Sequence, residues 1–131
     1  MASILVIDDD HSVLATIRIL LEREAHDVVV TDDGRKGLDL FRTSTFDLLI
    51  VDIFMPAMDG LETMSLVHRL RPTVPVIVIS GHEIRLASKH APDFLQMATK
   101  LGAISSIQKP FRSRDLLAAV DNCLSGTLPP R

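Results

Sequence analysis

The sequence predicts an α/β fold: a doubly wound, five-stranded parallel sheet in the order 2-1-3-4-5 with helices on both faces. Five short apolar runs rich in β-branched residues recur along the chain, each with the length of a buried strand. Stretches with helical spacing separate them, and no hairpin turn joins consecutive runs. Buried parallel strands are continuously apolar and need such crossover connections. The runs are residues 4–7, 28–30, 48–51, 76–79 and 103–107.

Apolar residues at helical spacing predict helices between the strands and at the end of the chain. Ser12 and Asp59 precede the first and third helical stretches, and both residue types favour the N-cap position. The interval 81–101 is irregular, and we expect an extended loop there before a helix at about 92–101, with Pro92 in its first turn. The apolar stripes are Val13, Ile17, Leu20 and Leu21; Leu38 and Phe41; Leu61, Met64 and Leu70; and Leu116, Leu117, Val120 and Leu124.

Length and composition predict one domain. The chain has 131 residues and 47% hydrophobic content, which is enough for a single core. We expect a domain over residues 1–124 and a short C-terminal tail over residues 125–131, which contain Gly126, Pro129 and Pro130. Lys and Arg number 14 against 17 Asp and Glu, and the net charge of −3 gives no reason to expect a nucleic-acid or anionic-membrane surface.

The sequence favours a cytoplasmic protein. Cys123 is the single cysteine, which excludes an internal disulfide and suits a reducing compartment. We interpret Cys123 as a small apolar residue of the last helix. The N-terminus lacks the basic flank of a signal peptide, and no apolar stretch is long enough to span a bilayer.

Polar residues follow four of the five predicted strands. Asp8 and Asp9 follow the first strand, Asp52 the third, Ser80 the fourth and Lys109 the fifth. In a doubly wound parallel sheet, binding and catalytic groups gather at the rim formed by the carboxyl ends of the strands. We therefore expect these five residues to converge at one rim.

Asp8, Asp9 and Asp10 form a run of like charges at the end of a buried strand. Their mutual repulsion calls for a nearby positive charge, and a divalent metal is the usual candidate. Mg²⁺ prefers a few carboxylates and keeps several waters, which leaves room for a phosphate. Thr31 and Asp32, which follow the second strand, are interpreted as ordinary loop polarity because that strand lies at the sheet edge.

Lys109 and Ser80 would complete a site for phosphoryl transfer. With the acids balanced by a metal, Lys109 can bind a phosphate as a point charge, and the Ser80 hydroxyl can donate to another phosphoryl oxygen. Metal, ammonium and hydroxyl together stabilise a transferring phosphoryl group. A carboxylate would be the nucleophile, and the product an acyl phosphate. Each residue taken singly is more often an ordinary loop or surface residue, but their joint placement favours a functional site.

The same residues resemble a known family, the receiver domains of bacterial two-component response regulators. The resemblance covers residues 3–124, and an aspartate followed by Met-Pro-x-Met-Asp-Gly is a highly specific signature. Four pieces carry it: Asp8-Asp9-Asp10 after Ile4-Leu5-Val6-Ile7; Asp52-Ile53-Phe54-Met55-Pro56-Ala57-Met58-Asp59-Gly60; Ser80 after Val76-Ile77-Val78-Ile79; and Lys109-Pro110-Phe111.

The resemblance implies a phosphoacceptor in signal transduction rather than an enzyme. Asp52 would be the phosphorylated residue, and Ser80 and Lys109 would contact its phosphoryl group. The Lys109-Pro110 bond would be cis. The donor would be a phosphohistidine on a sensor histidine kinase or phosphotransfer protein, and exposed Ile19 on the first helix hints at its docking surface. The chain would hydrolyse its acyl phosphate slowly and switch the binding of an output protein.

The resemblance also implies the metal ligands. Asp9 would bind Mg²⁺ directly and Asp8 largely through water, with Asp52 and the backbone carbonyl of Phe54 completing the protein ligands. No nucleic acid and no membrane is expected to bind this chain.

Two features depart from the family pattern. Receivers commonly place an aromatic residue three positions before the lysine, where it reports phosphorylation to partners, and this chain has Ser106 there. The output mechanism of the family therefore does not carry over. The path from Ser80 to Lys109 is also longer than usual, and we place the additional residues in a loop at 84–90, near the surface that receivers use for signalling.

Two other functions stay open at this level. A haloacid-dehalogenase-like phosphatase also uses an aspartyl nucleophile, Mg²⁺, a Ser or Thr and a Lys, and Asp8-Asp9-Asp10 fits its Asp-x-Asp motif. That interpretation leaves Asp52 unexplained and needs an acidic pair on a strand after Lys109, where only helical Asp115 and Asp121 occur. A receiver-shaped module that acts through protein contacts without phosphorylation is the second alternative.

Overall fold

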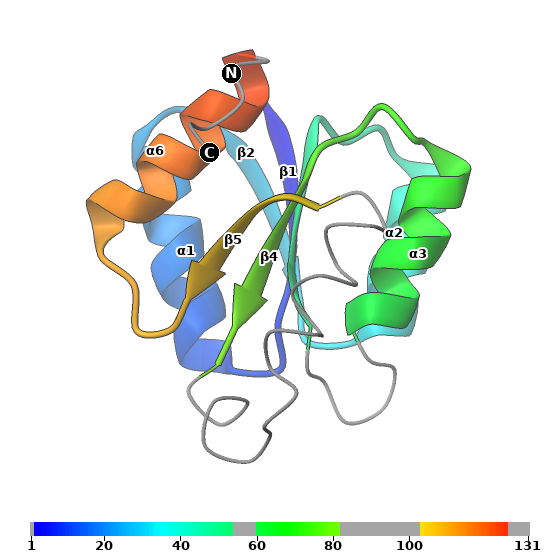
Figure 1. Ribbon diagram of the computed structural model, residues 1–131, viewed down its shortest axis with the longest axis horizontal. Helices are drawn as coiled ribbons and strands as arrows, with labels where there is room; N and C mark the ends of the chain where they lie inside the picture. The colour runs from blue at the N-terminus through cyan, green and yellow to red at the C-terminus, as the bar shows by residue number, and fades with distance from the viewer. Residues whose placement is uncertain (1, 54–59, 82–102, 126–131) are drawn as a thin grey trace.

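The structure is a computed structural model that describes residues 2–53, 60–81 and 103–125 (Figure 1). Five parallel strands form one sheet in the order β2-β1-β3-β4-β5, so the predicted fold class and strand order are confirmed. The strands are β1 (Ser3–Ile7), β2 (Asp27–Thr31), β3 (Leu48–Asp52), β4 (Val76–Ser80) and β5 (Ala103–Gln108), and the helices are α1 (His11–Arg23), α2 (Gly34–Thr43), α3 (Gly60–Leu70) and α6 (Ser113–Ser125).

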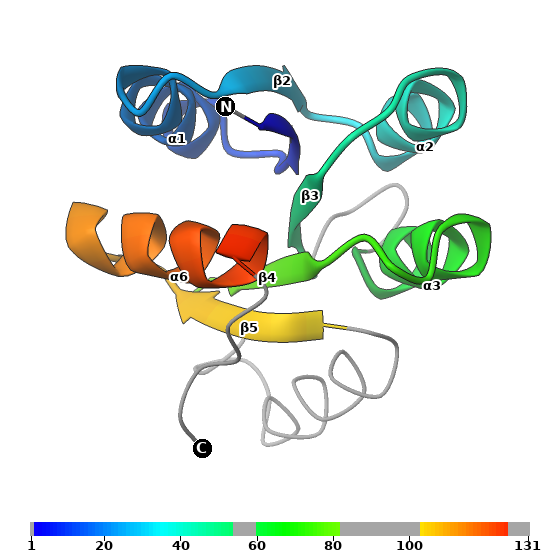
Figure 2. The same ribbon diagram turned by 90° about the horizontal axis from the view of Figure 1, so that it is seen from above.

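Helices cover both faces of the sheet. Figure 2 shows α1 and α6 on one face and α2 and α3 on the other. In β1, Ile4 and Val6 pack in the core beneath α1 and α6, whereas Leu5 and Ile7 pack in the core beneath α2 and α3. Both faces of the strand are therefore buried, which explains its continuous apolar run.

Asp10, not Ser12, caps α1. The Oδ1 atom of Asp10 accepts hydrogen bonds from the backbone N–H groups of Ser12 at 3.0 Å and Val13 at 3.3 Å. The prediction for Ser12 is wrong because the helix has already begun at His11, and the Ser12 hydroxyl donates to the same Asp10 oxygen at 2.6 Å. This hydrogen bond from Ser12 is the main reason why the pKa of Asp10 lies below its usual value.

Asp10→Ala is expected to lower the free energy of unfolding by about 1 kcal/mol, because it removes the acceptor for two N–H groups at the start of α1. Asp10→Asn removes the same charge but keeps an acceptor, and should retain most of that stability. Urea unfolding followed by circular dichroism measures both variants. Equal losses in the two variants would contradict the capping role.

The buried stripe of α3 differs from the predicted one. Thr63, Met64 and Val67 are fully buried, whereas Leu70 is 46% exposed. Leu70 is the last residue of the helix, where the chain leaves α3 for the turn that leads to β4. The prediction that Leu70 belongs to the buried stripe is therefore wrong.

A stacked aromatic pair closes the core at the far end of α2. The rings of Phe41 and Phe46 have centroids 6.2 Å apart and an interplanar angle of 10°. Phe41 is fully buried, and the guanidinium carbon of Arg71 lies 4.8 Å from the centroid of its ring. Arg71 also donates from Nη1 to the Phe41 carbonyl oxygen, so one arginine ties α2 to the segment after α3.

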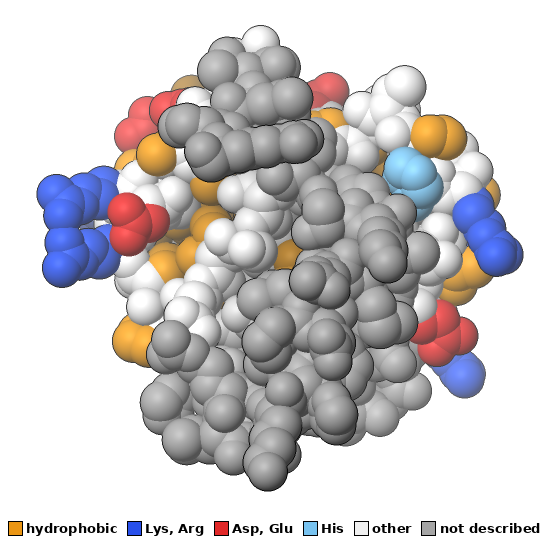
Figure 3. All heavy atoms as spheres, in the orientation of Figure 1, with side chains coloured by type: hydrophobic (Ala, Val, Ile, Leu, Met, Phe, Trp, Pro, Cys, Tyr) orange, Lys and Arg blue, Asp and Glu red, His pale blue; other side chains and the backbone are white. Residues whose placement is uncertain are grey.

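Several expectations lie outside the described residues: the cap at Asp59, the loop at 84–90, the helix at about 92–101, and the tail beyond residue 125. Cys123 is buried on α6 as predicted, and burial raises the pKa of its thiol. None of the helices in the described part of the chain is long and apolar enough to cross a lipid bilayer. Figure 3 shows Lys and Arg side chains at both lateral margins of one face, with acidic side chains beside them.

Candidate functional site

The ends of four neighbouring strands bring the predicted site residues to one rim. Asp52 ends β3, which lies between β1 and β4, and Ser80 ends β4 beside β5. Asp8 directly follows β1, and its backbone N–H donates to the Thr31 carbonyl oxygen at 3.2 Å. The Lys109 backbone N–H donates to the Ser80 carbonyl oxygen at 2.8 Å, which fixes the start of the loop after β5.

Lys109 bridges two buried carboxylates. Its Nζ atom lies 2.7 Å from Asp8 Oδ2 and 3.0 Å from Asp52 Oδ2. The Asp8 side chain is fully buried, that of Asp52 is 6% exposed and that of Lys109 is 17% exposed. Because these charges are mostly shielded from water, their attraction is stronger than that of a surface ion pair. The predicted convergence of the first, third and fifth strand ends is therefore confirmed.

Asp8, Asp9 and Asp52 form a set of hard oxygen donors. One carboxylate oxygen from each lies within 4.8 Å of the other two. Asp8 Oδ1 accepts the Asp10 backbone N–H at 2.9 Å. Among the described residues, Asp8 Oδ2 receives no well-directed hydrogen bond despite its ion pair with Lys109. Clustered carboxylate oxygens, one of them incompletely satisfied, fit the coordination preferences of Mg²⁺.

The charges of the cluster shift the pKa values of its members. Burial raises the pKa of Asp8, the charge of Asp52 raises it further, and the contact with Lys109 opposes the rise. Burial and the charge of Asp8 raise the pKa of Asp9. Burial alone would lower the pKa of Lys109, but its contacts with Asp8 and Asp52 outweigh that effect and raise it. The raised pKa therefore favours the charged form of the ammonium.

Three other predictions concern Ser80, the Lys109-Pro110 bond and Phe54. Ser80 is 5% exposed at the rim, at the end of β4. The Lys109-Pro110 peptide bond is cis, as the resemblance implied. Phe54 lies outside the described residues.

A contact that the sequence analysis missed lies beside the acidic cluster. His11 Nε2 is 2.7 Å from Asp32 Oδ2, and both side chains are exposed to solvent. The sequence alone suggests only ordinary loop polarity for Asp32. A signal for the contact was present, because Asp32 follows the strand that neighbours β1 and the start of α1 lies at the same rim.

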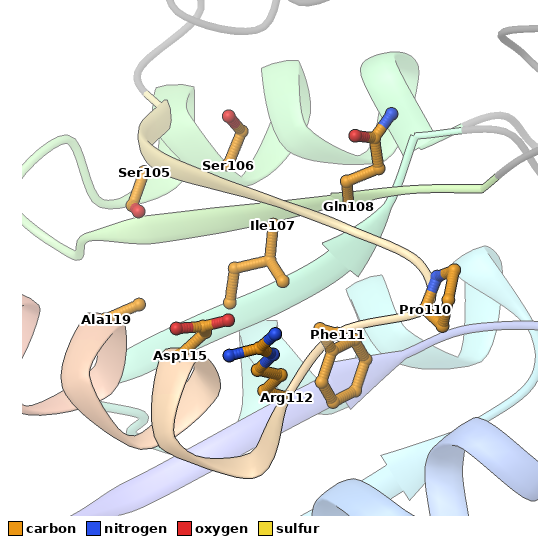
Figure 4. A pocket seen from close by; sticks show the side chains of 9 residues that line it. All are labelled: Ser105, Ser106, Ile107, Gln108, Pro110, Phe111, Arg112, Asp115 and Ala119. Atoms are coloured by element: carbon orange, nitrogen blue, oxygen red, sulfur yellow. The ribbon is translucent and has the colours of Figure 1, made fainter.

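Ser106 lies on β5 with its side chain exposed. Figure 4 shows Ser106 and Gln108 on one side of the strand and Ser105 and Ile107 on the other, where α6 begins. Residues of β5 and of the loop and helix that follow line a hollow of about 390 Å³. At the position where receivers commonly carry an aromatic residue, this chain therefore has a small hydroxyl side chain next to a hollow.

A comparison with known protein families identifies the family of this chain. The family model described as "Response regulator receiver domain" matches residues 4–121, which is most of the chain. The chain belongs to the response regulator receiver domain family. The predicted family is therefore confirmed.

Curated relatives are longer regulators. The receiver is 33% identical over 120 residues to the transcriptional regulatory protein CpxR of Escherichia coli K12, covering 92% of this chain and 48% of the relative. It is 30% identical over 128 residues to the transcriptional regulatory protein GlrR of the same strain, covering 98% of this chain and 27% of the relative. The chain therefore spans about a quarter to a half of the length of these relatives.

Solved receivers share the fold over nearly their whole length. A CheY-like response regulator receiver domain protein from Methanospirillum hungatei JF-1 has a TM-score of 0.86 and 30% identity, covering 96% of this chain and 95% of that one. A receiver domain protein from Clostridium thermocellum has a TM-score of 0.84 and 30% identity, covering 96% of each chain.

Membership of this family decides the class of function. Receiver domains are signalling phosphoacceptors of two-component systems, not enzymes in the usual sense, and response regulators work with histidine kinases and output domains. The comparisons give no support to a haloacid-dehalogenase-like phosphatase or to a module that acts without phosphorylation.

Proposed function

We propose that Asp52 of this receiver accepts the phosphoryl group and that Ser80 and Lys109 contact it after transfer. The observation that carries the proposal is the buried Asp52 carboxylate with the Lys109 ammonium 3.0 Å from its Oδ2 atom. A carboxylate oxygen of Asp52 would attack the phosphorus of a phosphohistidine, the P–N bond would break, and its electron pair would return to the imidazole nitrogen. The product on this chain would be an acyl phosphate.

Asp8, Asp9, Asp52 and the backbone carbonyl of Phe54 would hold Mg²⁺. The close carboxylate oxygens of the three aspartates support this assignment, and Phe54 enters through the family resemblance alone. Mg²⁺, when bound, would balance the carboxylates and polarise the phosphoryl oxygens. Lys109 would then exchange a carboxylate contact for a phosphoryl oxygen, and Ser80 would donate its hydroxyl proton to another.

The donor would be a sensor histidine kinase or a phosphotransfer protein, and this receiver would work in the cytoplasm. Ile19 on α1 is 52% exposed, and its apolar side chain would form part of the docking surface for the donor. The new charge on Asp52 would shift the population of two conformers and so switch the binding of an output protein. Slow hydrolysis of the acyl phosphate would end the signal.

Residues 1–124 would form the receiver unit and residues 125–131 a short tail. The described residues 2–53, 60–81 and 103–125 form one sheet with its covering helices, which supports a single unit. The relatives CpxR and GlrR are transcriptional regulatory proteins of greater length. We propose that this chain itself does not contact nucleic acid, and that in a longer regulator such contacts would belong to an output segment.

Reaction with acetyl phosphate tests the acceptor. After incubation with Mg²⁺, borohydride reduction and peptide mass spectrometry should locate the acyl phosphate at Asp52. The modification should be absent in EDTA and in Asp52→Asn. Asp39→Asn, which changes an exposed aspartate of α2, is the matched control and should be modified like the wild type.

Other outcomes would contradict the proposal. Modification of Asp8 in place of Asp52 would favour the phosphatase. A chain that takes up no phosphate and shows no Mg²⁺-dependent spectral change with beryllofluoride would favour a module that works without phosphorylation.

A further inference from the structure

The His11–Asp32 pair joins two loops beside the acidic cluster. The Nε2 atom of His11 lies 2.7 Å from Asp32 Oδ2. His11 is the first residue of α1, and Asp32 directly follows β2. Because β1 lies between β2 and β3, this pair flanks Asp8 on one side while Asp52 flanks it on the other.

The Asp32 side of the contact is held by the loop around it. Thr31 precedes Asp32, and its carbonyl oxygen accepts the backbone N–H of Asp8 at 3.2 Å. Asp33 follows it and caps α2, accepting the backbone N–H of Arg35 at 2.7 Å. The Asp33 backbone N–H donates to the Thr31 hydroxyl at 3.3 Å. Asp32 therefore projects from a backbone that is fixed on both sides.

The His11 side carries the metal ligands. Only Asp8, Asp9 and Asp10 connect β1 to α1, and Asp9, an exposed residue, stands in the middle of this connection. A shift of the start of α1 would therefore move the Asp9 carboxylate relative to Asp8. Functional groups must be held within about 0.5 Å of their productive positions. Here the two ends of the connection hold the Asp9 carboxylate.

We propose that the His11–Asp32 pair is a positioning contact for the cation site: it holds the start of α1 against the loop after β2, so that Asp9 presents its carboxylate beside Asp8 and Asp52. The inference rests on the proposed function, because it concerns the same Mg²⁺ site. The His11 and Asp32 side chains are 76% and 47% exposed, so the pair contributes little to global stability. Its effect is on the position of a ligand.

Mg²⁺ titration calorimetry on the full chain measures this effect directly. His11→Ala and Asp32→Ala should each weaken Mg²⁺ binding by about three- to tenfold, which is at or below the lower end of the effect of contacts behind a metal ligand, because this contact acts through the backbone. The double variant should bind Mg²⁺ no more weakly than either single variant, because all three lack the same contact. In EDTA, amide hydrogen exchange of residues 8–11 should be faster in each variant, whereas the urea unfolding midpoint should hardly change.

Two controls separate the contact from other effects. Asp32→Asn removes the charge but keeps an acceptor for His11, and should bind Mg²⁺ almost as the wild type does. Arg18→Ala breaks another exposed pair on α1, in which Arg18 Nε lies 3.5 Å from Glu22 Oε1, and should leave Mg²⁺ binding unchanged.

Unchanged Mg²⁺ affinity in both alanine variants would overturn the inference. Equal weakening by Asp32→Asn and Asp32→Ala would also overturn it, because the long-range field of the carboxylate would then explain the effect. The inference is also wrong if the double variant weakens Mg²⁺ binding by the product of the two single effects, because the two residues would then act separately. A different result would contradict the proposed function: a wild-type chain that is not phosphorylated on Asp52 in the presence of Mg²⁺.

Discussion

Lys109→Ala is expected to lower the free energy of unfolding by about 3 kcal/mol in EDTA, because it leaves two buried carboxylates without their cation. Lys109 lies 2.7 Å from Asp8 and 3.0 Å from Asp52, and water reaches neither carboxylate freely. Mg²⁺ should restore part of the lost stability, since it would supply positive charge to the same oxygens. The chain has no Trp and no Tyr, so urea unfolding is best followed by circular dichroism.

The loss in Lys109→Ala should depend on pH. In the folded wild type the pKa of Asp8 already lies above its ordinary value of 3.8, because of burial and despite the contact with Lys109. Removal of that contact raises the pKa further, so the folded variant binds a proton more readily than its unfolded chain does. Its stability should therefore fall as the pH rises from about 3.8 through the folded pKa, and the deficit should be smallest at acid pH.

Lys36→Ala is the matched control for Lys109→Ala. Lys36 is exposed on α2, and its removal should change stability by no more than about 0.5 kcal/mol. If the two variants unfold at the same urea concentration in EDTA at neutral pH, the bridging role of Lys109 is wrong.

Phe41→Ala should cost about 3–5 kcal/mol, a large share of the stability of a domain this size. The variant loses a fully buried ring, its stack on Phe46 and its contact with the guanidinium of Arg71. The surrounding core would collapse only in part, which leaves a cavity between α2 and the sheet. Urea or thermal unfolding of the apo chain measures the loss.

Phe41→Leu separates volume from aromatic chemistry. It keeps most of the apolar volume but loses the stack and the cation–π contact, and should cost about 1–2 kcal/mol. Leu70→Ala, at a 46% exposed position, should cost much less than Phe41→Ala. A similar loss in Leu70→Ala and Phe41→Ala would show that Phe41 does not anchor the core.

The strands were predictable because both faces of the sheet are covered. Central strands such as β3 are apolar at nearly every position, and the run at residues 48–51 differs from Leu48–Asp52 only by its charged end. Edge strand β2 extends one residue beyond the predicted run at each end, to Asp27 and Thr31, because polar residues pair there through their backbone. A pattern of apolar residues does not reveal polar residues that belong to a strand.

Helix ends and helix faces were less predictable. Ser12 and Asp10 are both good N-cap residues, and the choice between them depends on how soon the chain turns after β1, which is a tertiary property. Buried Thr63 and exposed Leu70 on α3 reverse the usual preference of their residue types. Their burial depends on where the helix lies over the sheet, and local spacing does not contain that information.

At the site, the rule for parallel strand ends predicts from the sequence that Asp8, Asp52 and Lys109 lie together. It could not show that one ammonium would contact both carboxylates, because a lysine side chain has four rotatable bonds and its direction depends on neighbouring charges. For the His11–Asp32 pair, the strand order put both residues at the same rim, but the contact itself depends on how the two loops approach each other in space.

The number of charges at the rim explains why a divalent cation suits it. Three carboxylates with one resident ammonium carry a formal excess of two negative charges, and a single doubly charged ion cancels this excess where a monovalent ion would leave one unbalanced. Converting one carboxylate into an acyl phosphate then adds one negative charge to a neutral assembly. Lys109 is the one cation with a flexible side chain among the described residues of this set. The added negative charge would therefore change which oxygen its ammonium contacts.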